Sequence, residues 1–356
     1  MERELRLMKG NEAIAEAAIR EGTDGYFGYP ITPQSEILEY LMEANPSQTT
    51  GMVVLQAESE VAAINMVYGG AACGKKVMTS SSSPGISLKQ EGITYIAGAE
   101  LPCLIVNVVR GGPGLGTIQP AQSDYFQAVK GGGHGDYHLI VLAPASVQEM
   151  ADFVELAFEL AFKYRNPAMI LSDGAIGQMM EKVYLKPQKK RSDIIYDWAT
   201  TGKPASRDHN IITSLNLDPH KQEVHNQKLQ DKYKTIRETE VRYEEYMVDD
   251  AECLIVAYGT SARVSQKAVE LARAEGIKAG LLRPITLFPF PTKRLDELAH
   301  RMKAIVAVEM SAGQMVEDVK LAVCGKTFVN HFGRMGGVIP TPEEVLENMK
   351  SNLKGR

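Results

Sequence analysis

The sequence predicts an α/β protein, with a doubly wound, mostly parallel sheet followed by a smaller α/β unit. Strand-like and helix-like stretches alternate from about residue 8 to residue 180, as they do in parallel sheets with crossover helices. Residues 102–109 are almost purely apolar, as expected of a central strand covered on both faces. The alternation returns after residue 251, and 356 residues exceed one ordinary core, so two units are expected.

The elements of the first unit have separate signals. Apolar residues at helical spacing predict a helix over residues 11–20, which Gly22 ends. Thr32-Pro33 predicts a helix start, with threonine as N-cap and proline in the first turn. Ser146 and Glu149 form a capping box that starts a helix reaching about residue 164. The other expected elements are strands at 25–29, 52–55, 77–80, 102–109, 139–142 and 168–171, and helices at 59–72 and from the serine-rich turn to about 97.

The pattern breaks between residues 182 and 250, where a charged run is followed by turn residues without an apolar period. Near the end of this stretch, apolar residues recur at spacings of 4, 3, 7 and 4 and predict a polar helix with one apolar stripe: Leu229, Tyr233, Ile236, Tyr243 and Met247. We interpret the stretch as an interdomain excursion.

A second α/β unit begins at residue 251. Its expected elements are strands at 253–257, 279–282 and 304–309, and helices at 261–275, 292–302 and 314–323. The chain is therefore divided into residues 1–181, 182–250 and 251–356.

Composition narrows the class of protein. Hydrophobic residues make up 44% and charged residues 23%, as in soluble globular chains, and the net charge of -5 argues against nucleic acid as a partner. The charged residues 1–6 precede no apolar run, and no stretch reaches the roughly 18 apolar residues of a membrane span, so the cytoplasm is expected. The four cysteines are expected to be buried thiols that provide no iron–sulfur or zinc ligand set: Cys73, Cys103, Cys253 and Cys324.

Two polar motifs follow predicted strands. Tyr29-Pro-Ile-Thr-Pro-Gln-Ser35 is a proline-framed turn, and Gln56-Ala-Glu-Ser-Glu-Val-Ala-Ala63 runs from a strand end into a helix. The carboxyl ends of parallel strands meet at one edge of a sheet, where α/β proteins bind ligands. Glu60 is then either a carboxylate that interacts with the helix dipole or an acid that takes part in chemistry.

Arg110-Gly-Gly-Pro-Gly-Leu-Gly116 follows the most apolar predicted strand and emerges at the same edge. A guanidinium group beside flexible glycines suits a carboxylate ligand, although a solvated loop arginine is the alternative. The segment lacks the Gly-x-Gly-x-x-Gly fingerprint, so a dinucleotide site is not expected. The hydroxyl groups of residues 80–83 either cap the next helix or face an anionic ligand.

Two other motifs are weaker indications of a functional site. Gly69-Gly-Ala-Ala-Cys-Gly-Lys75 has the letters of a phosphate loop, but it follows a helix and precedes a strand, which is the reverse of the required order. His134 and His138 have the spacing of two metal ligands on a helix, yet they lie in a glycine-rich loop, so a metal site is not expected there.

Four motifs together carry a family resemblance: Tyr29-Pro-Ile-Thr-Pro33, Gln56-Ala-Glu-Ser-Glu-Val-Ala-Ala63, Thr79-Ser-Ser-Ser-Ser-Pro-Gly85 and Asn107-Val-Val-Arg-Gly-Gly-Pro-Gly114. They resemble the α subunits of 2-oxoacid:ferredoxin oxidoreductases over almost all of residues 8–180. Leu282-Arg-Pro-Ile-Thr-Leu-Phe-Pro-Phe290 and Val308-Glu-Met-Ser-Ala-Gly-Gln314 are similar, more loosely, to the family's transketolase C-terminal-like domain.

The resemblance implies a thiamine diphosphate enzyme whose cofactor bridges two chains. Residues 1–181 would be the domain that holds the aminopyrimidine ring, and a β subunit would carry the diphosphate and Mg²⁺ site, whose Gly-Asp-Gly signature is absent here. Glu60 matches the family's activating glutamate, whose carboxyl group bonds the ring nitrogen and favours the imino tautomer. Thr32 and Arg110 match the residues that face the substrate and pair with its carboxylate. The resemblance implies no metal ligand on this chain, and it implies further cofactor contacts at Pro30, Ile31, Ser82 and Ser83.

The implied reaction is oxidative decarboxylation of a 2-oxoacid with coenzyme A, giving an acyl-CoA and carbon dioxide. Electrons would leave through iron–sulfur clusters on a ferredoxin-like δ subunit to ferredoxin, in an assembly that also contains a γ subunit. The resemblance points to the branched-chain acid 2-ketoisovalerate, and it implies activity only with the partner subunits present.

Three alternatives remain at this point. In a 2-oxoglutarate enzyme of the same family, Lys89 or Lys130 could bind the distal carboxylate of the substrate. A non-catalytic scaffold subunit is of another class, and the presence of Glu60, Thr32 and Arg110 weighs against it. An unrelated nucleotide-binding oxidoreductase is opposed by the missing dinucleotide fingerprint.

Overall fold

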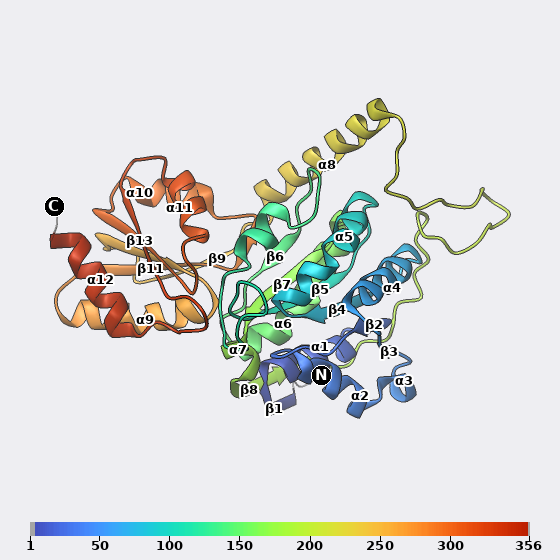
Figure 1. The fold of residues 1–356 in the computed structure, drawn as a ribbon, viewed down its shortest axis with the longest axis horizontal. Coiled ribbons are helices and arrows are strands. Elements are labelled where there is room, and N and C mark those ends of the chain that lie inside the picture. Colours follow the sequence, from blue (N-terminus) through green and yellow to red (C-terminus); the bar gives the residue numbers. More distant parts are fainter. Residues whose placement is uncertain (1–3, 355–356) are drawn as a thin grey trace.

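The computed structural model describes residues 4–354, so the first three residues of the charged N-terminal stretch lie outside it. Figure 1 shows two sheets with flanking helices, one at each side of the molecule. The seven-stranded sheet has the order β12-β6-β7-β5-β4-β2-β3, and its strands are parallel except β12. These strands are β2 (Gly25–Gly28), β3 (Val53–Gln56), β4 (Val77–Ser81), β5 (Leu104–Val109), β6 (Ile140–Leu142), β7 (Ala168–Asp173) and β12 (Thr286–Phe288).

Helices cover both faces of this sheet, as the doubly wound class requires. α4 (Glu60–Ala72) and α5 (Ser83–Gly98) link strands that advance in one direction, and they pack together on one face. α6 (Val147–Tyr164) returns from β6 to β7 in the opposite direction and packs with α1 (Gly10–Arg20) on the other face. Because β5 lies between these layers, it is buried at every position. The shorter elements are α2 (Ser35–Ala44), α3 (Pro46–Thr49), the π-helical turn η1 (Gln127–Gly131) and α7 (Gly174–Gln178).

A two-stranded antiparallel sheet of β1 (Glu4–Lys9) and β8 (Met180–Leu185) closes the first unit. The sequence pattern predicts neither strand. Leu5 and Leu7 alternate with charged residues, yet they are 49% and 63% exposed. The buried apolar residue of β1 is Met8, which packs with Val183 and Leu185 of β8.

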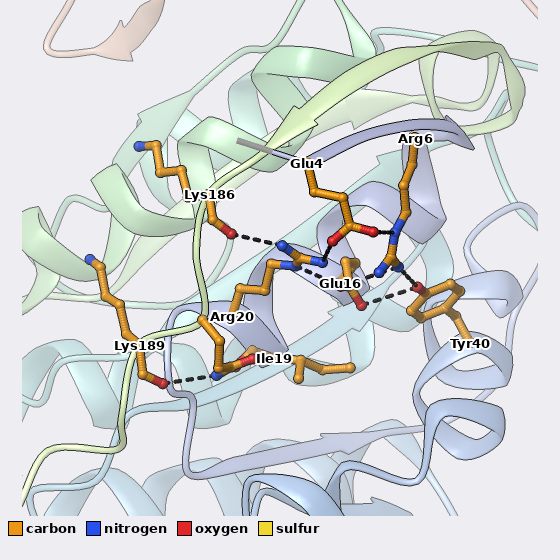
Figure 2. A network of polar contacts seen from close by, with 9 residues as sticks. Glu4, Arg6, Glu16, Ile19, Arg20, Tyr40, Lys186 and Lys189 are labelled. Atoms are coloured by element: carbon orange, nitrogen blue, oxygen red, sulfur yellow. Dashed lines mark hydrogen bonds and ion pairs between the residues drawn. The ribbon is translucent and has the colours of Figure 1, made fainter. Parts of the chain in front are cut away.

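Ion pairs attach this small sheet to the helices, as Figure 2 shows. Glu4 accepts hydrogen bonds from Arg6 at 2.6 Å and from Arg20 at 2.5 Å. These bonds, first the one from Arg6, lower the pKa of Glu4 to about 2. Arg20 also pairs with Glu16 at 2.6 Å and donates to the backbone carbonyl of Lys186 at 2.9 Å, which links α1 to the segment after β8.

The stretch after β8 only partly matches its prediction. α8 (Pro219–Thr239) forms and buries Leu229, Tyr233 and Ile236. The stripe does not continue, because the chain leaves the helix and enters β9 (Tyr243–Tyr246), an antiparallel edge strand of the second sheet. Residues 186–218 lie within the described range and contain no helix or strand. Part of this segment lies on the first unit, where Arg191 pairs with Asp24 and the Thr200 N–H donates to the Ala72 carbonyl, and part of it loops away from the body in Figure 1.

The five-stranded sheet has the order β14-β13-β10-β11-β9, and all pairings except that of β9 are parallel. Its remaining strands are β10 (Cys253–Ala257), β11 (Ala279–Pro284), β13 (Ala304–Glu309) and β14 (Phe328–Gly333). One pair of contacting helices is α9 (Gly259–Ala274) with α12 (Pro342–Lys354), and a second is α10 (Thr292–Ala299) with α11 (Met315–Val323). The sequence pattern does not predict β14 and α12.

The two units are joined by more than the chain between them. After β11 the chain crosses back, and β12 pairs with β6 at the edge of the first sheet. Gln122, which follows the glycine-rich loop, donates to the backbone carbonyl of Tyr258 at 2.8 Å and accepts from the Ser261 hydroxyl at 2.7 Å and the Met310 N–H at 3.0 Å. The loop that begins at Arg110 is therefore anchored on the second unit.

Two of the cysteines differ from expectation. Cys103 and Cys253 are buried, whereas Cys73 and Cys324 are exposed, and all four are free thiols. The exposed pair are the C-cap residues of α4 and α11, where the chain reaches solvent despite its apolar neighbours in sequence. Within residues 4–354, no helix combines the length and the apolar character needed to cross a membrane.

Candidate functional site

The strand order reverses direction at β2, which pairs with β3 on one side and with β4 on the other. At such a switch point the loops diverge and open a crevice at the carboxyl ends of the strands. Pro30, Ile31 and Thr32 follow β2, and residues 81–83 end β4 and start α5. All of them lie at the carboxyl edge of the sheet, at this switch point.

Glu60 is the first residue of α4 and is only 6% exposed, whereas Glu58 is exposed. Its carboxyl group lies against the first turn of α5. A Cβ atom on Gly85 would fall 2.6 Å from Glu60 Oε1 and 2.0 Å from Ser81 Oγ, so glycine is required for this close approach. Glu60 is therefore a buried carboxyl group at the switch point and not a solvated first-turn carboxylate.

The serine run supplies two buried hydroxyl groups with no partner among the described residues, those of Ser81 and Ser82. Ser82 is the N-cap residue of α5, but its side chain makes no capping bond. Ser83 is engaged, since its hydroxyl accepts from the Arg110 N–H at 3.1 Å. Because buried polar groups are nearly always hydrogen-bonded, two unpaired hydroxyls beside Glu60 fit a polar ligand in the crevice.

Arg110 is 7% exposed and is held by backbone oxygens on both sides of the crevice. Nη1 donates to the carbonyl of Thr32 and Nη2 to the carbonyl of Leu115, each at 3.0 Å. Its buried Nε has no partner among the described residues. Arg110 is therefore a positioned arginine and not a solvated loop side chain, and it lies next to Thr32 as the sequence predicts.

The predicted N-cap role of Thr32 is wrong. α2 begins at Ser35, with Gln34 in the N-cap position, and Thr32 lies in the turn before it with its side chain exposed. A turn precedes the helix instead, closed by a hydrogen bond from the Gln34 N–H to the Ile31 carbonyl at 3.0 Å. The consequence is that the Thr32 hydroxyl stays available at the crevice.

A pocket of about 140 Å³ opens beside Arg110, between the start of α5 and the glycine-rich loop. Its lining includes Asp124, a residue that no sequence motif singles out. Burial raises the pKa of the Asp124 carboxyl, while hydrogen bonds from Asn107 and Ser83 oppose that rise. Asn107 donates to Asp124 at 2.9 Å. Only the fold brings this acid to the site, so no local signal could have found it.

The two lysines considered for a distal carboxylate lie elsewhere. Lys89 is fully buried and donates to the Thr79 hydroxyl at 2.7 Å. Lys130 lies on η1 and pairs with Asp318 of α11, in a separate groove of about 1180 Å³ between the two units. Neither lysine lines the pocket beside Arg110.

The remaining motifs have structural roles. Residues 69–75 form the last turn of α4 and the connection to β4, so they are not a phosphate loop. The His138 ring stacks on the Phe288 ring with 4.3 Å between the ring centroids. The rings of His134 and Tyr95 are perpendicular, with their centroids 6.5 Å apart. Among residues 4–354 no group of three or more His, Cys, Asp or Glu side chains could hold a metal ion.

Comparisons with known proteins identify the family. Residues 16–249 match the thiamine diphosphate-binding domain of pyruvate flavodoxin/ferredoxin oxidoreductases, and residues 251–345 match core domain II of pyruvate:ferredoxin oxidoreductase. The chain is 54% identical to the ketoisovalerate oxidoreductase subunit VorB of Methanothermobacter thermautotrophicus, over 97% of each chain. It is 36% identical to the 2-oxoglutarate synthase subunit KorA of Archaeoglobus fulgidus, over 98% of this chain and 100% of that one.

Solved structures agree with this assignment. The 2-oxoglutarate:ferredoxin oxidoreductase of Magnetococcus marinus, with 2-oxoglutarate, coenzyme A and succinyl-CoA bound, matches 99% of this chain with a TM-score of 0.87 and 28% identity. This chain spans 66% of that solved chain. An inactive tetramer of a split-gene transketolase shares the fold, with a TM-score of 0.61 at 15% identity. The resemblance carried by the four motifs is confirmed: the chain belongs to the 2-oxoacid:ferredoxin oxidoreductases, as a subunit of a multi-subunit enzyme with a thiamine diphosphate-binding domain.

Proposed function

We propose that this chain is the α subunit of a 2-ketoisovalerate:ferredoxin oxidoreductase. The enzyme would convert a branched-chain 2-oxoacid and coenzyme A to an acyl-CoA and carbon dioxide, and it would reduce ferredoxin in the cytoplasm. The observation that carries the proposal is the buried Glu60 carboxyl at the switch point, next to the unpaired hydroxyls of Ser81 and Ser82 and on the same sheet edge as Arg110.

These residues fit the aminopyrimidine end of thiamine diphosphate. Glu60 would hold a proton between its carboxyl oxygen and the ring nitrogen, and its burial strengthens that interaction because no water competes. Ser82 and Ser83 from β4 and α5, with Pro30 and Ile31 from the opposite wall, would complete the contacts. When bound, the cofactor supplies a nucleophilic thiazolium carbon and an electron sink for decarboxylation.

Arg110 and Thr32 would orient the 2-oxoacid. The guanidinium group is fixed at two corners by backbone oxygens at 3.0 Å, so it presents a directed positive charge to a carboxylate. Thr32 lies next to Arg110, and its exposed hydroxyl would donate to the same anion. Prepositioned donors of this kind need no reorganisation when the substrate binds.

The relatives of the chain and the pocket beside Arg110 both favour a branched-chain 2-oxoacid over 2-oxoglutarate as the substrate. Identity is 54% to the ketoisovalerate subunit against 36% to the 2-oxoglutarate subunit. A substrate with two carboxylates needs a second cation, and neither Lys89 nor Lys130 lines the pocket beside Arg110. A substrate with an apolar tail needs none.

The remaining parts of the reaction would come from partner chains. We assign the diphosphate and Mg²⁺ site to a β subunit, and the iron–sulfur clusters to a δ subunit that passes electrons to ferredoxin, with a γ subunit completing the assembly. The four free cysteines support this division, because they are distributed over separate elements and two of them are buried in strands or next to one. The solved relative with coenzyme A bound supports a coenzyme A step in the assembly.

We further propose that residues 1–181 hold the pyrimidine ring, residues 251–356 anchor the substrate loop, and the 182–250 excursion contacts a partner subunit. Residues 186–218 contain no helix or strand and carry exposed apolar side chains such as Leu215 and Leu217. Replacing residues 200–212 by a short Gly-Ser linker should reduce assembly with the partner subunits in size-exclusion chromatography. Unchanged assembly would remove that role.

The decisive experiment compares Glu60→Gln with Glu58→Gln in the co-expressed complex. Glu60→Gln should lower thiamine-dependent ferredoxin reduction by at least about 100-fold, the usual range for a group that moves a proton. Glu58→Gln, an exposed change two residues away, should retain the wild-type rate. The rate should be highest with 2-ketoisovalerate among 2-ketoisovalerate, pyruvate and 2-oxoglutarate. Full activity of Glu60→Gln would instead favour the scaffold alternative.

A further inference from the structure

Lys89 is a buried charged residue of α5, the helix that Glu60 approaches, and the proposed reaction does not use it. It lies on the face of α5 that carries Gly85 and Gly92, four and three residues away, and its side chain has 0% exposure. The two glycines mark where α4 presses on α5. A Cβ on Gly85 would meet Glu60 Oε1 at 2.6 Å, and one on Gly92 would meet Ile64 at 2.5 Å. Lys89 therefore lies between the contact points of α4, on the same helix face as the contact of Glu60.

Only two atoms are bonded to the Lys89 ammonium group in the described structure. Nζ donates to the Thr79 hydroxyl at 2.7 Å and to the backbone carbonyl of Ser80 at 3.2 Å, both in β4. An ammonium group has three donors, so these two neutral acceptors do not balance its charge. A carboxylate on a neighbouring element would stabilise the charged form of such a buried ammonium group.

The elements packed around Lys89 offer one carboxylate. α4 contributes Glu60, whose charge interacts with that of Lys89. β2 contributes Tyr26, whose hydroxyl is bonded to that of Ser80 at 2.7 Å and whose pKa is raised by burial, so it stays neutral. Burial lowers the pKa of Lys89 to about 7, and the Glu60 charge acts in the opposite direction.

We propose that Lys89 is a positioning residue that acts through Glu60, its ammonium charge stabilising the carboxylate that remains when Glu60 passes a proton to the cofactor's ring nitrogen. In that step the O–H bond of Glu60 breaks and an N–H bond forms on the ring. The ring gains the positive charge and Glu60 the negative one, which Lys89 offsets. The inference rests on the proposed role of Glu60 in binding thiamine diphosphate.

Two substitutions distinguish a role of the Lys89 charge from a role of its two hydrogen bonds. Lys89→Met removes a buried charge and keeps an unbranched side chain of similar length, so its melting temperature should equal or exceed that of the wild type. Lys89→Gln also removes the charge but retains a donor for the Thr79 hydroxyl. If Lys89 served only to bond Thr79 and Ser80, Lys89→Gln would keep wild-type behaviour.

The test uses both variants and Glu60→Gln in the complete complex, with two readouts. The first is the number of protons taken up or released when thiamine diphosphate binds, from calorimetry in buffers of different ionisation enthalpy. The second is the pH profile of kcat. Both Lys89 variants should change the proton count and should move the alkaline limb of the profile, where Glu60 loses the proton that it must donate, upward by about one pH unit or more, the usual effect of one close charge.

The possible outcomes distinguish the role of Lys89 from that of Glu60. A wild-type proton count and pH profile in Lys89→Gln and Lys89→Met, while Glu60→Gln is inactive, would overturn the role of Lys89 and leave the proposed function intact. An active Glu60→Gln would overturn both. If Lys89→Met fails to assemble, Lys89→Gln provides the same test, and failure of both to assemble would assign Lys89 to folding and reject the proposal.

Discussion

Arg110 donates a hydrogen bond from Nη1 to the backbone carbonyl oxygen of Thr32, 3.0 Å away, although 78 positions separate the two residues in the chain. The bond links the end of β5 to the turn after β2 and fixes where the guanidinium charge lies. Because that charge is held by main-chain atoms, its position does not depend on neighbouring side-chain rotamers.

Replacing Arg110 by Lys should therefore weaken substrate use. An ammonium group cannot span both Thr32 and Leu115 while facing a carboxylate. We expect kcat/KM for 2-ketoisovalerate to fall by about 10- to 100-fold, the value of one charge-assisted hydrogen bond, mainly through KM. Steady-state ferredoxin reduction measures this. Lys130→Met is the control, because Lys130 pairs with Asp318 outside the pocket, and an equal loss in that variant would contradict the assignment.

Gly85→Ala tests the close approach of α5 to Glu60. The added Cβ would meet Ser81 Oγ at 2.0 Å and Glu60 Oε1 at 2.6 Å, so the carboxyl group must move. Overpacking of about 1–3 kcal/mol should appear as a loss of thiamine diphosphate affinity of about tenfold or more in calorimetry. Gly69→Ala is the matched control on α4, where no atom lies within 4 Å of the added Cβ and helix propensity predicts a small gain in stability.

Gln122→Ala should loosen the anchor between the two units. The substitution leaves the buried Met310 N–H and Ser261 hydroxyl without their acceptor. Each unpaired buried group costs about 1–3 kcal/mol, so a melting temperature several degrees lower is expected. Gln119→Ala, in the same loop but exposed, should melt like the wild type, and a Gln122→Ala protein with unchanged stability would argue against the anchor.

Stability should fall on acidification through His138. Burial, helped by the nearby Arg237 charge, lowers the pKa of His138 from 6.5 to about 4, so the folded state keeps the ring neutral. A histidine whose pKa is depressed by folding stabilises the protein above its unfolded pKa and loses that contribution as pH falls toward the folded value. Between about pH 6.5 and 4 the loss should be on the order of 1–3 kcal/mol.

His138→Phe keeps a ring to stack on Phe288 and removes the titration. Its melting temperature should therefore depend less on pH than that of the wild type across this window. His209→Asn, in the exposed segment, should leave the slope unchanged. An identical slope in all three proteins would show that other groups control acid stability.

The sequence could predict those residues of the site that lie at the carboxyl ends of strands. Glu60 and Arg110 each follow a predicted strand of one parallel sheet, and the carboxyl ends of such strands must share an edge. It could not predict Asp124 or the surroundings of Lys89, because both depend on which distant elements pack there. The sequence pattern also fails to predict the strands β1, β12 and β14. They lie at sheet edges or in partly exposed pairs, where apolar and polar residues do not alternate clearly.

The placement of β12 has a consequence for the integrity of the molecule. β12 lies in the first sheet, although the chain before and after it folds in the second. A protease that nicked residues 186–218 would cut the backbone and still leave two fragments interlocked by a shared sheet, by Gln122 and by the packing of α8. Two separately synthesised fragments with this break should find each other and reassemble. The connection between the two fragments could therefore become longer or be lost in evolution without loss of the site at the edge of the first sheet.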